Sequence, residues 1–235
     1  MLSSSLLVGS PAAEVAHCLI EADAYRIADP ARPDTFYRWK CGISAPSYLD
    51  CRTAVADPSV RREVVDAFVR SASLNFPHAD GVVGLSESGI GWGMLVAEAL
   101  DLPAHFVRKE AKRHGTGRLV EPPPAAHREV LVIDDLVASG ASVEAALGHL
   151  ADCGVRALGV LSIANWGFVE MHRRLAGCPV RALTSYPQLL AAALVHQQIT
   201  TRTAAALARF YTDPRGESRQ EPRAGRHALV PVAVR

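Results

Sequence analysis

Residues Val130–Val143 read VLVIDDLVASGASV, and this stretch decides the fold. It predicts a buried strand that ends in the carboxylates of Asp134 and Asp135, followed by a loop of small residues that opens a helix. A helix start presents unpaired backbone N–H groups and a positive dipole end, and Gly140 lets a phosphate approach that backbone closely. The two carboxylates are suited to accept hydrogen bonds from ribose hydroxyls or to stabilise positive charge on a sugar ring. The stretch favours a phosphorylated sugar; a solvated strand end before an ordinary turn is the alternative.

The neighbouring sequence predicts an α/β fold. Short apolar strands alternate with helices of roughly ten residues, which indicates a parallel sheet covered by helices on both faces. Ligands of such sheets bind beyond the carboxyl ends of the strands. The predicted strands are 81–85, 104–107, 130–133, 157–163 and 180–183, and helices are predicted up to residue 100, over 142–153, and between 163 and 180.

The flanking segments predict one domain over residues 1–212, with its core at 81–185. Ser10 and Pro11 signal a first helix, and Asp57-Pro58 opens another that runs to about Ser73. Residues 25–55 lose the helical period and predict short strands and loops outside the main sheet. Two more helices are predicted after Tyr186-Pro187 and after a Thr200 cap. Residues 213–235 lack an apolar period and are expected to be a disordered tail.

Composition narrows the class of protein. The chain has 235 residues, 49% of them apolar, which supports one sizeable core. A net charge of +1 gives no overall field that would favour nucleic acid or an anionic membrane, so we expect neither as a partner. The five cysteines are widely spaced and include no Cys-x-x-Cys pair, and the N-terminus shows no signal peptide. These features predict reduced thiols in a cytoplasm.

A basic cluster follows the predicted strand 104–107. Five potential cations occupy the seven residues 108–114, and glycines bound the cluster on its C-terminal side. Cations brought over a pyrophosphate leaving group by a flexible lid would stabilise the charge that this group gains. The alternative is a solvated charged loop, which is the usual fate of such runs.

The stretch 130–143 resembles the motif that binds phosphoribosyl pyrophosphate (PRPP) in type I phosphoribosyltransferases. It has the same order of apolar strand, two acids, two apolar residues and small-residue phosphate loop. The resemblance implies that Asp134 and Asp135 contact the ribose. It implies that the 5-phosphate is bound by Ala138, Ser139, Gly140, Ala141 and Ser142. Ala138 departs from the family, which usually has Thr or Ser there.

The basic cluster resembles the catalytic loop of orotate phosphoribosyltransferases, which read Arg-x-x-x-Lys-x-His-Gly at this spacing. The resemblance implies that Lys112 and His114 are catalytic together with the acid pair, and that Arg108 and Lys109 also bind PRPP. In that family the loop commonly reaches the neighbouring subunit's site, so we expect a homodimer that shares it. Prolines 122–124 replace the usual glycine after Glu121, and this stiffens one hinge of the loop.

Residues 39–52, WKCGISAPSYLDCR, resemble the segment near the base pocket of the same family. Backbone groups, hydroxyls and an aromatic wall can read the edge of a flat base. The residues expected at the base are Trp39, Lys40, Gly42, Ser44 and Ala138. The alternative is that the aromatic residues belong to the core and that Lys40 is a surface cation.

Residues 84–91, GLSESGIG, resemble the pyrophosphate loop of the family, so we expect Ser86 and Ser88 at the pyrophosphate of PRPP. Glu87 would place an acid beside this anion, although backbone donors would still bind it. A glycine-rich turn between a strand and a helix is the alternative.

Together the resemblances imply a type I phosphoribosyltransferase fold: a twisted parallel sheet with helices on both faces and a small N-terminal hood. The expected reaction is the Mg²⁺-assisted transfer of ribose 5-phosphate from PRPP to orotate, with the metal bound mainly through PRPP and no dedicated protein ligands. A transferase for another base is one alternative, because of Ala138 and because no arginine for the carboxylate of orotate is identifiable. A PRPP-sensing regulator without catalysis is the other, and it would need a nucleic-acid-binding element.

Overall fold

A six-stranded sheet lies at the centre of the computed structural model, which describes residues 9–39, 41–110, 118–124 and 129–214. The strand order is β10-β9-β8-β5-β6-β7, and β7 alone runs antiparallel, against β6. The strands are β5 (Gly81–Leu85), β6 (Ala104–Val107), β7 (Val120–Glu121), β8 (Glu129–Val137), β9 (Arg156–Asn165) and β10 (Val180–Ser185).

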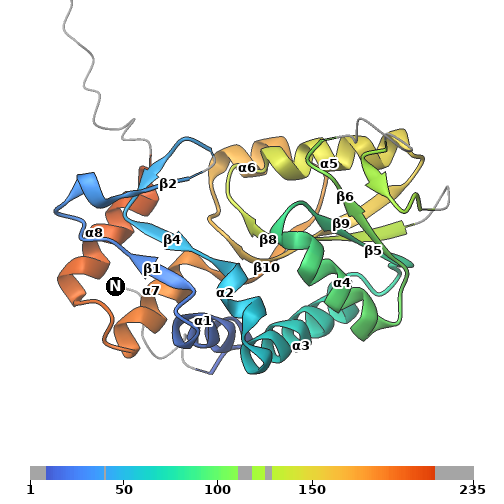
Figure 1. Cartoon of the computed structure of the whole chain (residues 1–235). Coiled ribbons are helices and arrows are strands. Elements are labelled where there is room, and N and C mark those ends of the chain that lie inside the picture. The colour runs from blue at the N-terminus through green and yellow to red at the C-terminus, as the bar shows by residue number, and fades with distance from the viewer. Residues whose placement is uncertain (1–8, 40, 111–117, 125–128, 215–235) are drawn as a thin grey trace, which may run out of the picture.

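Helices cover both faces of this sheet (Figure 1). One face carries α1 (Pro11–Glu21), α3 (Pro58–Asn75) and α4 (Ser88–Leu100), and the other carries α5 (Ala141–Asp152) and α6 (Val169–Arg174). Successive residues of a strand point to opposite faces, which explains why the strands are apolar throughout. In β8, Leu131 and Ile133 belong to the first cluster of buried residues, whereas Val130 and Val132 belong to the second.

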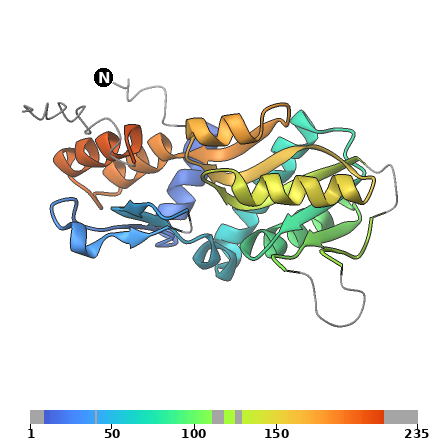
Figure 2. The ribbon, with the colours of Figure 1, turned by 90° about the horizontal axis from the view of Figure 1, so that it is seen from above.

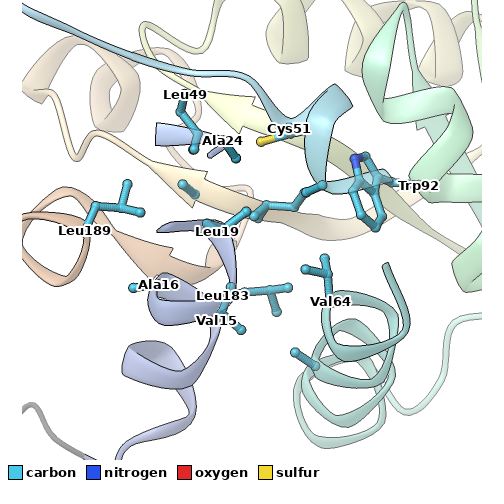
Figure 3. Packing of buried hydrophobic residues seen from close by; sticks show 14 of the residues in the cluster. Val15, Ala16, Leu19, Ala24, Leu49, Cys51, Val64, Trp92, Leu183 and Leu189 are labelled. Atoms are coloured by element: carbon cyan, nitrogen blue, oxygen red, sulfur yellow. The ribbon is translucent and has the colours of Figure 1, made fainter. Parts of the chain in front are cut away.

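The larger cluster packs α1, α3 and α4 against the sheet, and it also includes buried residues between 24 and 54 and between 186 and 207. Leu19 of α1, Val64 of α3 and Trp92 of α4 meet there (Figure 3), and each is at most 1% exposed. The helices begin where side chains cap them: Ser10 Oγ accepts from the Ala13 N–H at 3.2 Å, and Asp57 Oδ1 accepts from the Ser59 N–H at 2.8 Å. Caps of this kind contribute about 1 kcal/mol each.

Residues 25–55 form a small hood beside one end of the sheet. In the hood, β1 (Tyr25–Ile27) pairs with β4 (Ser47–Leu49) and β2 (Tyr37–Arg38) pairs with β3 (Ser44–Ala45), both antiparallel. The C-terminal helices α7 (Tyr186–Val195) and α8 (Thr201–Thr212) lie at the same end (Figure 2). The short helices η2 (Pro33–Thr35) and α2 (Cys51–Ala56) complete the described elements.

The predicted alternation of strands and helices is confirmed, and so are the helices starting at Pro11 and Pro58. Several details differ. Residues 51–56 form helix α2, although short strands and loops were predicted up to residue 55. The sheet is not wholly parallel, because β7 joins its edge in the opposite direction. Strand β8 continues to Val137, so the two aspartates lie within a strand and not at its end. Helix α5 begins at Ala141, one residue before the predicted start.

Several sequence predictions lie outside the described residues. Lys40, Lys112, His114 and nearly all of the predicted tail are among them. Within the described ranges, none of the helices combines the length and apolarity that a membrane span requires.

Candidate active site

A cavity of ≈ 720 Å³ opens where the carboxyl ends of four sheet strands meet the hood. Its lining includes residues 86–88 after β5, Lys109 after β6, residues 134–143 of β8 and α5, and Trp166 after β9. Seven hood residues between Arg38 and Arg52 complete it. Parallel strands deliver their following loops to one edge of a sheet, which is why segments far apart in the sequence share this cavity.

The acid pair lies on β8 at the floor of the cavity. Asp134 is buried, with 7% of its surface exposed, and its Oδ1 accepts a hydrogen bond from the Asp135 N–H at 2.9 Å. On the strand, Asp134 is paired with Ser162 of β9, so its backbone position is fixed by the sheet. Asp134 and Asp135 both line the cavity, so carboxylates are available there to accept from ribose hydroxyls.

Helix α4 approaches the acid pair so closely that only glycine fits at its start. A Cβ on Gly89 would lie 2.9 Å from the Ile133 carbonyl oxygen and 3.0 Å from Asp134 Oδ1. Gly84 and Gly93 bring β5 and α4 equally close, since a Cβ on Gly93 would lie 2.7 Å from the Gly84 Cα. The start of α4, with Ser88, is thereby fixed beside the acid pair. The Ser86–Glu87 peptide, just before this helix, is cis.

The small-residue loop leads into α5 through Gly140. This residue has a φ of +79°, which favours glycine, and it is the N-cap of the helix. A Cβ there would also lie 3.2 Å from Leu175 Cδ1, just after α6, so this side chain would have to shift slightly. Ser142 is exposed in the first turn of α5, where backbone N–H groups have no partner within the helix. Residues 138–142 thus have the donors that an anion needs.

Aromatic residues form the wall between the hood and the sheet. Trp39 stacks on Trp166, with ring centroids 5.4 Å apart and planes at 16°, and Phe168 stacks on the same Trp39 at 6.2 Å. The Trp39 Nε1–H donates to the Ser47 carbonyl oxygen at 2.9 Å. Trp39 is therefore a core residue and a cavity residue at once. Sequence reasoning missed Trp166 as a site residue, although its place just after a sheet strand could have suggested it.

The electrostatics of the lining are mixed. Its charged residues include the cations Arg38, Arg52 and Lys109 and the carboxylates Asp50, Glu87, Asp134 and Asp135. The hydrogen-bonded guanidinium of Arg52 lowers the pKa of Asp50. Burial, followed by the charges of Asp135, Asp50 and Asp134, raises the pKa of the Cys51 thiol well above its ordinary value. With three cations against four carboxylates, these residues alone do not neutralise a polyanionic substrate.

Of the predicted site residues that the structure describes, three do not line this cavity. Arg108 forms an ion pair with Glu121, at 2.6 Å between Nε and Oε2, and its guanidinium carbon lies 5.3 Å from the Phe106 ring centroid. Gly42 occupies a hood turn with a φ of +85°, and Ser44 is exposed on β3. The described residues that the cavity does bring together are Trp39, Ser86, Ser88, Lys109, Asp134, Asp135 and Ala138 to Ser142.

Comparisons with known proteins agree with this geometry. Residues 64–167 match the family model of the phosphoribosyl transferase domain. The structure is similar to UMP synthase of Leishmania donovani, with a TM-score of 0.72 and 22% identity, over 86% of this chain and 42% of that protein. It is also similar to orotate phosphoribosyltransferase of Aeropyrum pernix, with a TM-score of 0.65 and 22% identity, over 75% of this chain and 96% of that one. The fold is therefore the phosphoribosyltransferase fold.

The sequence narrows the assignment further. It is 32% identical to the orotate phosphoribosyltransferase of Cutibacterium acnes over 209 residues, which are 88% of this chain and 95% of that protein. The chain belongs to the orotate phosphoribosyltransferase family, and the family and fold expected from the sequence motifs are confirmed.

Proposed function

We propose that the chain transfers ribose 5-phosphate from PRPP to orotate, giving orotidine 5'-phosphate and pyrophosphate. The observation that carries this proposal is the shared cavity: the acid pair of β8 and the open helix start of α5 line it together. A ribose with a 5-phosphate presents hydroxyls to the carboxylates and an anion to the helix start. Membership of the family supports orotate as the base.

PRPP would lie across the carboxyl edge of the sheet. Its 5-phosphate would take the backbone N–H groups of residues 138–142, and its ribose hydroxyls would donate to Asp134 and Asp135. Its pyrophosphate would meet residues 86–88 and Lys109, which lie together because the Ser86 N–H donates to the Val107 carbonyl oxygen at 3.1 Å. The remaining wall, formed by the hood and Trp166, would contact the base.

The reaction breaks the bond between ribose C1 and the pyrophosphate oxygen and forms a bond from C1 to N1 of orotate. Pyrophosphate leaves with the bonding electrons, and the N1 proton is released. Positive charge develops on the ribose ring as the leaving group departs, and the carboxylates of Asp134 and Asp135 stabilise it. The charge that pyrophosphate gains requires cations, which Lys109, Lys112 and His114 would supply.

Mg²⁺ is part of the proposal. Oxygen donors are the ligands that it prefers, and the cavity offers the carboxylates of Asp134 and Asp135. Among the described residues, no group of three or more His, Cys, Asp or Glu could hold a metal ion. As the family resemblance implies, the ion would enter with PRPP and keep mainly substrate and water oxygens. When bound, it would neutralise the charge on pyrophosphate.

The family resemblance extends the proposal to assembly and location. We propose a homodimer in which the loop bearing Lys112 and His114 serves the neighbouring subunit's cavity. A cytoplasmic location is part of the same proposal, and it agrees with five cysteines that are all free.

The test is orotate consumption, followed by ultraviolet absorbance with purified protein, PRPP and Mg²⁺. We expect loss of orotate that depends on both PRPP and the metal ion. PRPP binding without orotate loss would refute orotate as the base. It would favour the second candidate, a transferase for another base, which Ala138 in the phosphate loop makes worth testing with a panel of bases.

A further inference from the structure

Orotate differs from uracil by a carboxylate, so a cavity that selects orotate needs a cation for it. An ionised carboxylate that leaves water without a partner is costly, and a guanidinium matches its two oxygens with parallel N–H donors. This need for a cation rests on the proposed function, in which orotate is the base.

The described lining contains three cations, and two of them are not available to the base: one is paired with a carboxylate and one lies at the pyrophosphate end. The guanidinium of Arg52 donates two hydrogen bonds to the Asp50 carboxylate, from Nε to Oδ1 at 2.7 Å and from Nη2 to Oδ2 at 3.0 Å. Lys109 follows β6, beside the loop after β5 that carries Ser86 and Ser88. It therefore lies at the pyrophosphate end of the proposed PRPP site, not at the base.

Arg38 is the third cation, and it belongs to the wall assigned to the base. Its backbone is fixed on β2 by pairing with Ser44 of β3, and it directly precedes Trp39. The hairpin is held further by Tyr37, whose ring stacks on Tyr48 with centroids 5.6 Å apart. Within the described residues, the Arg38 side chain forms no ion pair, and it is exposed where the hood lines the cavity.

We infer that Arg38 binds the carboxylate of orotate and makes the enzyme select orotate over uracil. The backbone on both sides of Arg38 is fixed, by the hairpin on one side and by the packed Trp39 on the other, so that only the side chain has to be ordered on binding. Lys40, two residues further along the chain, lies outside the described residues, and as a neighbouring cation in the sequence it belongs in the test.

The experiment first establishes orotate turnover by the unaltered enzyme; if there is none, the proposed function fails before Arg38 is tested. Arg38→Met and Arg38→Lys are then compared with Arg32→Met. Arg32 is a matched control because it is an exposed hood arginine, paired with Asp34 at 2.9 Å, that does not line the cavity. KM and kcat are measured separately for orotate and for PRPP, and turnover of uracil is measured in the same assay.

Arg38→Met should lower kcat/KM for orotate by about 10- to 100-fold, the cost of losing a hydrogen bond to a charged group. KM for PRPP and turnover of uracil should stay unchanged, Arg38→Lys should retain part of the activity, and Arg32→Met should match the unaltered enzyme.

Three outcomes would overturn the inference. Unchanged kinetics of Arg38→Met with orotate would do so, and a loss confined to KM for PRPP would place Arg38 at a phosphate instead. A loss of orotate preference in Lys40→Met but not in Arg38→Met would assign the carboxylate to Lys40.

Discussion

The Arg108 guanidinium and the Glu121 carboxylate lie 2.6 Å apart, between Nε and Oε2. Their ion pair joins the two ends of residues 108–121, the basic segment, which contains the basic cluster. Arg108 follows β6 and Glu121 ends β7, and the Arg108 N–H donates to the Leu119 carbonyl oxygen at 2.8 Å between them. The ion pair is partly buried, with 30% and 17% of the two side chains exposed. Arg108 therefore closes the base of the segment that carries Lys112 and His114.

A double-mutant cycle should show that Arg108 acts through Glu121. Arg108→Met and Glu121→Gln should each lower kcat/KM to a similar extent, because either change releases the same junction. The coupling energy in unfolding should be about 0.5–1 kcal/mol, as for a partly exposed pair. A large loss of activity in Arg108→Met alone, with Glu121→Gln unaffected, would instead indicate a direct contact between Arg108 and PRPP.

Gly89→Ala should damage both stability and turnover. Its Cβ would lie 2.9 Å from the Ile133 carbonyl oxygen, so α4 must move away from the acid pair. Overpacking of this kind costs about 1–3 kcal/mol, measurable by urea unfolding. Gly91→Ala is the control on the same helix, since nothing lies within 4 Å of its Cβ, and it should stabilise the protein slightly. Equal effects of the two substitutions would contradict the close approach.

Asp135→Asn should lower kcat by roughly 100- to 1000-fold, the range seen when one electrostatic partner of a transition state is removed. The amide keeps the shape of the carboxylate but not its charge, so the unfolding midpoint should change little. A kcat close to that of the unaltered enzyme would remove Asp135 from the chemistry.

Lys112→Ala tests the basic segment. Turnover should fall by about 100-fold or more while the melting temperature stays the same, because the side chain is proposed to stabilise the leaving pyrophosphate. Arg113→Ala is the matched control, as a neighbouring cation without a proposed role. Equal activity in both variants would exclude Lys112 from the mechanism.

The buried thiol of Cys51 should lower the free energy of unfolding at alkaline pH. Its raised pKa means that the folded thiol stays neutral after the unfolded thiol, with a pKa of about 8.5, has ionised. The stabilising contribution is complete below that pH and is lost as the pH rises above it, by up to about 1.4 kcal/mol per pH unit. Unfolding free energies of the unaltered chain and of Cys51→Ala should therefore converge between pH 8 and 10.5; parallel curves would show that Cys51 ionises normally in the fold.

The sequence predicted the positions of helices and strands better than it predicted which strands pair with one another. Apolar runs and caps specify β5, β9, α1 and α3 because those signals are local. The pairing of β7 with β6 could not be predicted from the sequence, because a strand of two residues is too short to show an alternation of apolar and polar side chains. Nor could the length of β8 be read, because Asp134 and Asp135 are polar. The pairing of Asp134, Leu136 and Val137 with β9 extends the strand past them.

The same distinction holds for the site. The residues predicted for the phosphate loop and the acid pair line one cavity, and a contiguous stretch of sequence was enough to group them; their roles stay predictions. Arg108 was assigned to PRPP from its spacing, whereas its ion pair depends on a residue 13 positions away. Trp166 was missed because its role comes from contact with Trp39, which belongs to a distant part of the chain.

The stacked pair of Trp39 and Trp166 joins the hood to the sheet, so its circular dichroism should report whether the two remain in contact. Two stacked indoles with centroids 5.4 Å apart couple their electronic transitions, so the far-ultraviolet circular dichroism of the protein should carry a signal that neither ring produces alone. The third tryptophan, Trp92, lies in the core with Phe68 and takes no part in this stack. Detachment of the hood from the sheet could therefore be followed by light in the unlabelled protein, separately from the unfolding of the core.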